Sequence, residues 1–317
     1  MTSVEICAGA GGQSLGLERA GFDHEALVEI DDACCATLRL NRPQWNVLHG
    51  DVNGFDGRPF KGVELLAGGV PCPPFSVAGK QLGAKDERDL FPEALRLTDE
   101  IRPRAVMLEN VRGFLDPAFE GYRNRLFGQF RKLGYKPAIR LFQASDHGVP
   151  QLRPRVVIVA LRPSDADHFT WPEKSTTPAP TVGETLEDLM AANGWAGARQ
   201  WAAGARAIAP TIVGGSKKHG GPDLGPTRAR KAWAQLGVEG GTIAETAPEP
   251  GFTGMPRLTV RMVARIQGFP DDWHFSGRKT AAYRQVGNAF PPPVAEAVGR
   301  SIQEVFERAS LRSVMVA

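Results

Sequence analysis

The chain has 317 residues, of which 42% are hydrophobic and 23% charged, a composition typical of a globular protein with a sizeable core. No apolar run is long enough to span a membrane, and the N-terminus MTSVEICAGAGG lacks a basic, apolar leader, so a cytoplasmic location is expected. The four cysteines, Cys7, Cys34, Cys35 and Cys72, show no CxxC spacing, which argues against a disulfide framework and against a metal site.

Short apolar runs alternate with helical patterns over the first half of the chain. Strands are predicted at residues 3–8, 25–30, 63–67, 105–109, 136–142 and 155–161. Helices are predicted between them at residues 14–20, 31–40, 90–100 and 122–133. This alternation predicts an α/β fold with a doubly wound, mostly parallel sheet. In such sheets, ligands bind at the carboxyl ends of the strands.

The texture of the sequence changes near residue 171. Pro, Gly, Thr and Ala become frequent up to about residue 254, and periodicity weakens. Helical patterns return at residues 258–267 and 291–308. We therefore expect a catalytic domain of residues 1–171 plus 285–317. Residues 172–284 are expected to form a second, smaller and irregular domain together with a hinge.

Positive charge is concentrated in part of this second region. The net charge is only +3, yet residues 199–231 contain seven Lys or Arg against one acidic residue. Such a segment suits the neutralisation of phosphates, although a solvated surface loop explains the charge equally well. Its basic residues include Lys217, Lys218, Arg228 and Arg230.

A glycine-rich turn, AGAGG at residues 8–12, follows the first predicted strand and precedes a helix. Glycines allow close backbone approach to a ligand, and they leave the helix N-terminus free for an anionic group. Glu29 and Asp51 follow at the ends of the next two strand-like stretches. A turn and two acids in this order suit a cationic ligand that carries a ribose and an exocyclic amine. The alternative is that the two acids only cap helices.

Cys72 stands between prolines in GVPCPPFS, just after the strand predicted at residues 63–67. A rigid loop position of this kind is typical of a nucleophile, whereas the other three cysteines are expected to be inert fillers. Glu109 closes the apolar strand AVMLENV, where partial desolvation would raise the pKa of the carboxyl group and suit a proton donor. Capping of a helix by the Glu-Asn pair is the alternative.

Two arginines, Arg153 and Arg155, precede another strand in QLRPR. Side chains two residues apart in an extended segment point to the same side. The pair therefore suggests recognition of an anion or a base, and a solvated edge remains the alternative.

Nine motifs in one order resemble the DNA (cytosine-5)-methyltransferase family of bacterial restriction–modification systems. They are EICAGAGGQSLGLERAGF, VEIDDACCATLRLN, HGDV, GVPCPPFSVAGKQLG, RDLFPEALRL, LENVRGF, QLRPR, PRLTVRMVARIQGFP and AYRQVGNAFPPPVAEAVG. The resemblance covers nearly the whole chain and implies the S-adenosylmethionine-dependent methyltransferase fold. It places a variable target-recognition domain between QLRPR and PRLTVR, where the basic, Gly-rich segment lies.

The resemblance implies methyl transfer from S-adenosylmethionine to carbon 5 of a flipped-out cytosine in a short duplex sequence. Cys72 would add to carbon 6, and Glu109 would protonate ring N3. Arg153 would contact the base, while Arg155 would orient the site. Donor contacts are expected from Cys7, Ala8, Gly9, Gly11, Gly12, Glu29, Ile30, Asp51, Val52, Leu90, Asn288 and Ala289. DNA contacts are expected from Ser76, Lys80, Gln81, Lys217, Lys218, Arg228 and Arg230.

Three positions depart from the family pattern. Cys7 and Ile30 stand where aromatic residues are common, which predicts weaker stacking on adenine, and Asp89 stands where Gly is commoner. The alternatives are a tRNA cytosine-5 methyltransferase of the same fold and a non-catalytic DNA-binding relative. A nicotinamide-dependent oxidoreductase and an amino-methylating DNA enzyme fit fewer motifs. We expect a nucleoid-associated monomer without membrane contact, and a restriction endonuclease acting independently is a compatible partner.

Overall fold

The computed structural model describes residues 1–71, 89–215 and 221–316, with side chains described up to residue 309. Six residues predicted to act on DNA lie outside these ranges: Cys72, Ser76, Lys80, Gln81, Lys217 and Lys218. The roles assigned to these six side chains therefore remain predictions from the sequence.

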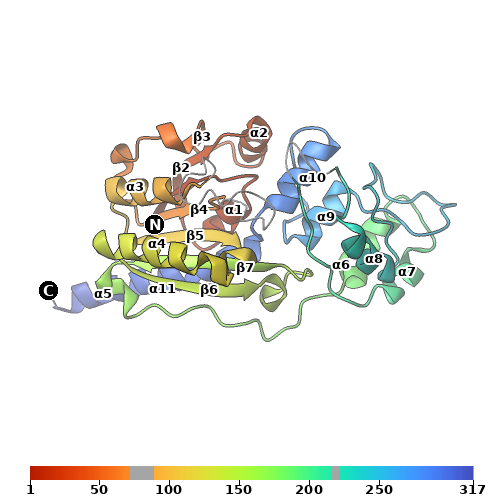
Figure 1. Ribbon diagram of the computed structural model, residues 1–317. Helices are drawn as coiled ribbons and strands as arrows, with labels where there is room; N and C mark the ends of the chain where they lie inside the picture. The colour runs from red at the N-terminus through yellow and green to blue at the C-terminus, as the bar shows by residue number, and fades with distance from the viewer. Residues whose placement is uncertain (72–88, 216–220, 317) are drawn as a thin grey trace.

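Seven strands form one sheet in the order β3-β2-β1-β4-β5-β7-β6 (Figure 1). The strands are β1 (Thr2–Ile6), β2 (Asp23–Glu29), β3 (Val47–His49), β4 (Leu65–Gly68), β5 (Ala105–Val111), β6 (Lys136–Gln143) and β7 (Pro154–Leu161). The first five are parallel, whereas β7 runs antiparallel to both β5 and β6. The predicted α/β fold with a mostly parallel sheet is confirmed.

Helices cover both faces of this sheet. They are α1 (Gly12–Arg19), α2 (Asp32–Asn41), α3 (Phe91–Ile101), α4 (Glu120–Lys132), α5 (Pro163–Ala166) and α11 (Pro292–Val316). Alternate strand residues enter different cores, as the pleat requires: Val106 packs with the residues of α3 and α4, and Met107 packs with those of α1 and α11. No helix in the described ranges combines the length and apolar character needed to cross a membrane.

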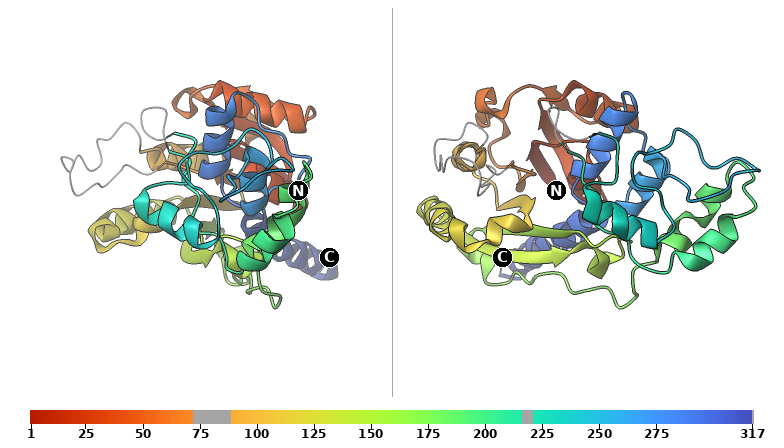
Figure 2. Two further views of the ribbon diagram at one scale, coloured as in Figure 1. Left: turned by 90° about the vertical axis from the view of Figure 1, so that its right-hand side faces the viewer. Right: turned by 45° about the vertical axis from the view of Figure 1, so that its right-hand side comes forward.

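The chain between the sheet and α11 forms a cluster of short helices beyond one end of the strands (Figures 1 and 2). These are α6 (Val182–Ala191), α7 (Ala198–Gly204), α8 (Thr227–Gln235), α9 (Val260–Ile266) and α10 (Lys279–Asn288). Four of them were not predicted, because frequent Gly and Pro hide their periodicity; only α9 was expected. Within the described part of residues 172–284, only isolated bridges replace strands.

The two halves share a buried apolar core. Leu27 and Leu38 belong to the same buried cluster as Trp233 and Tyr283 of the second half. The domain boundary expected at residue 285 also falls inside α10. The helical half therefore packs on the sheet half through continuous apolar contact, and α10 belongs to both.

Candidate active site

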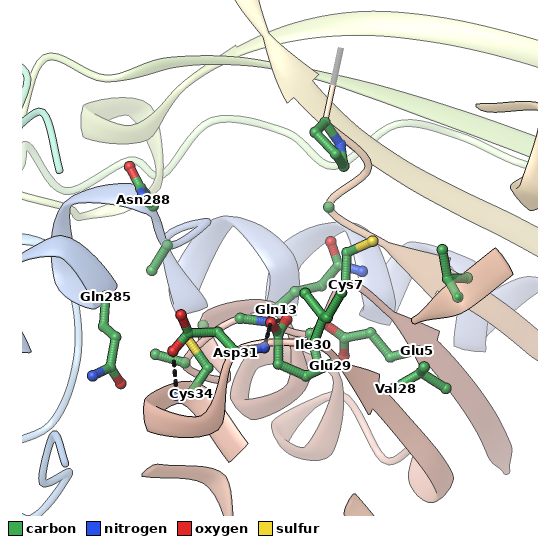
Figure 3. Close-up of a pocket in the computed structure, with 18 of the residues that line it drawn as sticks. Glu5, Cys7, Gln13, Val28, Glu29, Ile30, Asp31, Cys34, Gln285 and Asn288 are labelled. Atoms are coloured by element: carbon green, nitrogen blue, oxygen red, sulfur yellow. Dashed lines mark hydrogen bonds between the residues drawn. The ribbon is translucent and has the colours of Figure 1, made fainter. Parts of the chain in front are cut away.

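A cavity of about 590 Å³ lies at the carboxyl ends of the parallel strands, facing α10 (Figure 3). A doubly wound sheet binds its ligands at these strand ends, at the point where the strand order reverses, which here lies between β1 and β4. Eleven of the twelve predicted donor-binding residues line the cavity: Cys7, Ala8, Gly9, Gly12, Glu29, Ile30, Asp51, Val52, Leu90, Asn288 and Ala289. The structure thus brings together residues that lie up to 282 positions apart in the chain.

The glycine turn differs from its prediction in two details. Strand β1 ends at Ile6, two residues earlier than expected, because Cys7 already has a left-handed φ of +52°. Gly11 is absent from the lining, and its role is to allow packing: a Cβ there would lie 2.7 Å from side-chain atoms of Leu38 and Trp273. At Gly12, a Cβ would lie 2.2 Å from the Phe290 carbonyl oxygen, so only glycine allows this close approach.

Glu29 fastens this turn to the end of β2. Its two carboxylate oxygens accept the backbone N–H groups of Gly9, at 2.7 Å, and of Asp31, at 2.8 Å. Asp51 accepts both the backbone and side-chain N–H groups of Asn53, at 3.0 and 2.8 Å. Asp51 therefore does cap a short 3₁₀ helix, as the alternative reading held, and it lines the cavity as well.

The sequence analysis did not single out Glu5 and Gln13, two polar residues of the cavity lining. Glu5 is only 1% exposed, and neither its carboxylate oxygens nor the Gln13 amide atoms have a hydrogen-bond partner among the described residues. Burial raises the pKa of Glu5 to about 8, and the negative charge of Glu29 adds to this rise. A lone acid within the apolar strand SVEI was the available signal.

Burial keeps the three described cysteines in the thiol form at neutral pH. It raises the pKa of Cys7 to about 12 and that of Cys35 to about 11, with Glu29 adding to both, and it raises the pKa of Cys34 in the same way. A thiol of this kind is a poor nucleophile. Cys7 and Cys34 nevertheless line the cavity: this agrees with the donor contact predicted for Cys7, whereas Cys34 is not the core filler that was expected.

Glu109 stands at the end of β5 in the same cavity lining. Its carboxylate accepts from the Arg155 guanidinium at 2.8 Å, and the two side chains are 13% and 12% exposed. Burial raises the pKa of Glu109, while Arg155 and Arg153 oppose that rise. The following residue, Asn110, donates its side-chain amide to the Val70 carbonyl at 2.9 Å. Asn110 therefore holds the segment that leads into Cys72, and the Glu-Asn pair does not cap a helix.

The structure places the two arginines of QLRPR differently from what their predicted roles require. Arg153 is 0% exposed and donates to the carbonyls of Ile212, Gly287 and Ala289 at 2.7, 2.7 and 3.0 Å. The prediction that Arg153 contacts the base is therefore wrong, because its guanidinium group is enclosed by backbone. Arg155 instead pairs with Glu109, which lines the cavity.

The two described basic residues of the predicted DNA surface, Arg228 and Arg230, are exposed on α8. The opposite side of that helix is anchored by Trp233, which is fully buried. Helix α8 thus presents cations outward from a fixed position, as a phosphate-binding surface requires.

Comparison with known proteins agrees with this geometry. The profile of a family described as C-5 cytosine-specific DNA methylase matches residues 1–304. The chain belongs to that family. A type II methyltransferase of Lentzea aerocolonigenes, M.NaeI, is 61% identical over 95% of this chain and 74% of its own length. M.NgoMIV of Neisseria gonorrhoeae, also a type II methyltransferase, is 58% identical over 97% and 98%.

Solved structures share the fold of this methylase at lower identity. A putative DNA modification methyltransferase encoded within an E. coli prophage superposes with a TM-score of 0.69 at 22% identity, over 97% of this chain and 99% of its own. A variant of Spodoptera frugiperda DNMT2 gives 0.66 at 18% identity, over 95% and 99%. These two likenesses confirm the methyltransferase fold predicted from the motifs.

Proposed function

We propose that this methylase transfers a methyl group from S-adenosylmethionine to carbon 5 of a flipped-out cytosine in a specific short duplex sequence. The observation that carries the proposal is one continuous cavity. Its donor end holds Glu29 and Asp51, and its other end holds Glu109 and Pro71, the residue directly before Cys72. The donor site, the proposed proton donor and the segment that leads to the proposed nucleophile therefore adjoin the same cavity.

The cavity fits an S-adenosyl ligand. A Cβ on Gly9 would meet nothing within 4 Å, so the turn leaves open space for a ligand against its backbone. Glu29 would hold the ribose hydroxyls and Asp51 the adenine amine. The unpartnered Glu5 carboxylate suits the ammonium group of the methionine part. S-adenosylmethionine supplies a methyl group made electrophilic by a sulfonium.

The residues of this chain supply the activation of the base. The Cys72 thiolate would add to carbon 6 of cytosine, and Glu109 would protonate ring N3 as electron density moves onto the ring. Carbon 5 would thereby become nucleophilic enough to take the methyl group from the sulfonium, with S-adenosylhomocysteine as the leaving group. Water would then remove the carbon 5 proton, the bond to Cys72 would break, and N3 would return its proton. Arg155 holds Glu109 in place and is the arginine available to the base.

The DNA surface would combine Arg228 and Arg230 of α8 with Ser76, Lys80, Gln81, Lys217 and Lys218. We assign target recognition to the helical half, residues 172–284, with α10 returning the chain to the donor site. Two close relatives are named type II methyltransferases, which favours DNA over tRNA as the substrate. An independently acting restriction endonuclease, a monomeric state and association with the nucleoid complete the proposal.

The test uses a duplex with 5-fluorocytosine at the target, because fluorine on carbon 5 cannot leave as a proton. Bisulfite sequencing of DNA from cells that express the protein first identifies the target site. With S-adenosylmethionine present, the unmodified protein and Cys35→Ser should form a covalent adduct that peptide mapping assigns to Cys72. Cys72→Ser should form none while still binding DNA, and it should lose at least about a thousandfold in methylation rate. An adduct on another cysteine would refute the nucleophile.

A further inference from the structure

Three fully buried polar side chains, Gln151, Arg153 and Gln267, form one hydrogen-bond network behind the wall of the cavity. The Gln151 amide donates to the Gln267 side-chain oxygen at 2.6 Å. The Gln267 amide donates in turn to the Ala289 carbonyl at 2.6 Å, which Arg153 also contacts at 3.0 Å. Buried polar groups cost free energy unless they are paired, so such a network fixes the positions of the segments that it joins.

One end of the network holds the wall of the donor site. Ala289 and Asn288 line the cavity at the junction of α10 and α11. The backbone of this junction is held on both sides of Asn288, because Arg153 donates to the carbonyls of Gly287 and Ala289. A donor that contacts Asn288 or Ala289 therefore contacts backbone whose position this network sets.

The other end holds the helical half. The Ile212 N–H donates to the Gln151 side-chain oxygen at 2.9 Å, and the Ile212 carbonyl accepts from Arg153 at 2.7 Å. Ile212 is itself fully buried, in the apolar cluster that contains Trp233 of α8. The position of the helix that carries Arg228 is thus tied to the same buried side chains.

The backbone of the donor wall is also in direct contact with the backbone of residues 212–215. A Cβ on Gly287 would lie 2.4 Å from the Gly214 nitrogen, and one on Gly214 would lie 2.5 Å from the Arg284 carbonyl oxygen. Asn288 also donates to the Gly215 carbonyl at 3.2 Å. Movement of the donor wall and movement of residues 212–215 therefore occur together.

We propose that Gln151, Arg153 and Gln267 are positioning residues that couple donor binding to DNA binding. The inference rests on the proposed function, since it takes the cavity as the donor site and α8 as part of the DNA surface. The donor orders the wall from one side, and DNA orders the helical half from the other. Because both share these hydrogen bonds, ordering by either ligand lowers the cost of ordering for the other.

The experiment measures this coupling with S-adenosylhomocysteine, which has no methyl group to transfer, and a duplex that carries the bisulfite-identified site. DNA affinity is measured with and without S-adenosylhomocysteine, and S-adenosylhomocysteine affinity with and without DNA. The two factors must agree, because binding linkage is reciprocal. We expect about tenfold in the unmodified protein, which is within the usual range for coupled sites.

Gln267→Leu keeps the volume of the side chain but removes both of its hydrogen bonds, and it should reduce the coupling factor to less than about twofold. Thr98→Val is the matched control: Thr98 is equally buried, and among the described residues its hydroxyl donates only to the Ala94 carbonyl of its own helix. This control should keep the tenfold coupling. A residue with a merely structural role would weaken both affinities while leaving the factor unchanged.

Arg153→Lys is the second variant, and it tests the coupling if Gln267→Leu does not fold. Lysine keeps the charge but replaces the two separated donor nitrogens of the planar guanidinium with a single nitrogen, so coupling should fall to an intermediate value. An unchanged factor in either folded variant would overturn the proposal, as would a factor of one in the unmodified protein. If the unmodified protein forms 5-methylcytosine in duplex DNA, these outcomes refute the coupling but not the proposed function. If it forms no 5-methylcytosine, the proposed function itself is refuted.

Discussion

The sheet half and the helical half of the molecule hold their functional side chains in different ways. In the sheet half, Glu29 and Glu109 stand at the ends of strands whose backbone ladders fix them. In the helical half, short helices carry the surface cations, and side-chain contacts such as the buried Trp233 set their positions. The comparison teaches that substitutions at the strand ends should change chemistry with little effect on structure. Substitutions in the core of the helical half should change the arrangement of its helices.

Glu109→Gln tests the catalytic end of the sheet half and should have the largest effect. The amide is isosteric and still donates a hydrogen bond, but it cannot release a proton to ring N3. We expect the single-turnover methylation rate to fall about 10²- to 10⁴-fold. DNA affinity should stay within about twofold, because the strand ladder does not depend on this side chain. A rate within tenfold of the unmodified protein would exclude Glu109 as the proton donor.

Glu5→Gln sharpens the comparison at the donor end of the sheet. Glu5 has a pKa of about 8 in the folded protein, whereas the pKa of a glutamate side chain in the unfolded chain is 4.5. Its stabilising contribution is therefore complete below pH 4.5 and is lost as the pH rises toward 8, because the folded state keeps a proton that the unfolded chain releases. Between pH 6 and pH 8 the unmodified protein should lose about 2 kcal/mol more stability than Glu5→Gln. Urea denaturation at both pH values measures this difference. Equal losses of unfolding free energy in the two proteins would show that the Glu5 carboxyl group is exposed to solvent.

The same variant reports on donor binding. If Glu5 meets the ammonium group of the ligand, S-adenosylhomocysteine affinity should rise from pH 6 to pH 8 in the unmodified protein, because the ionised carboxylate is the form that pairs. In Glu5→Gln this pH dependence should be absent. Isothermal titration at the two pH values measures it, and an unaltered slope in the variant would assign the dependence to another group.

Arg228→Ala tests the outward face of the helical half and should have the smallest effect. Loss of one phosphate contact should weaken DNA binding a few-fold at low salt and reduce the slope of log K against log salt by about 0.9. The matched control is Arg131→Ala, which removes an exposed cation from α4 on the sheet half. Fluorescence anisotropy over a salt series compares the two. Equal slopes for both variants would move DNA recognition away from α8.

Local patterns were sufficient for the sheet half because its elements are encoded by contiguous residues. The glycine turn, Glu29 and Glu109 each belong to a short motif at the end of an apolar strand. A parallel sheet places all such ends at one edge, so these motifs converge without further information. The helices of the second half carry frequent Gly and Pro, and their weak periodicity left four of five unpredicted. Tertiary packing, and not local propensity, stabilises them.

The sequence by itself determined the family, the α/β fold, and most of the residues that line the donor site, because each depends on neighbours in the chain. Only the tertiary structure decided which arginine of QLRPR pairs with Glu109, a residue of the cavity lining. Arg153 meets carbonyls 59 to 136 residues further along the chain, whereas Arg155 meets Glu109 on the adjacent strand. The raised pKa of Glu5 also follows only from the tertiary structure, because it arises from burial of the carboxyl group. Burial and partners are properties of the packed molecule, so spacing in the sequence does not specify them.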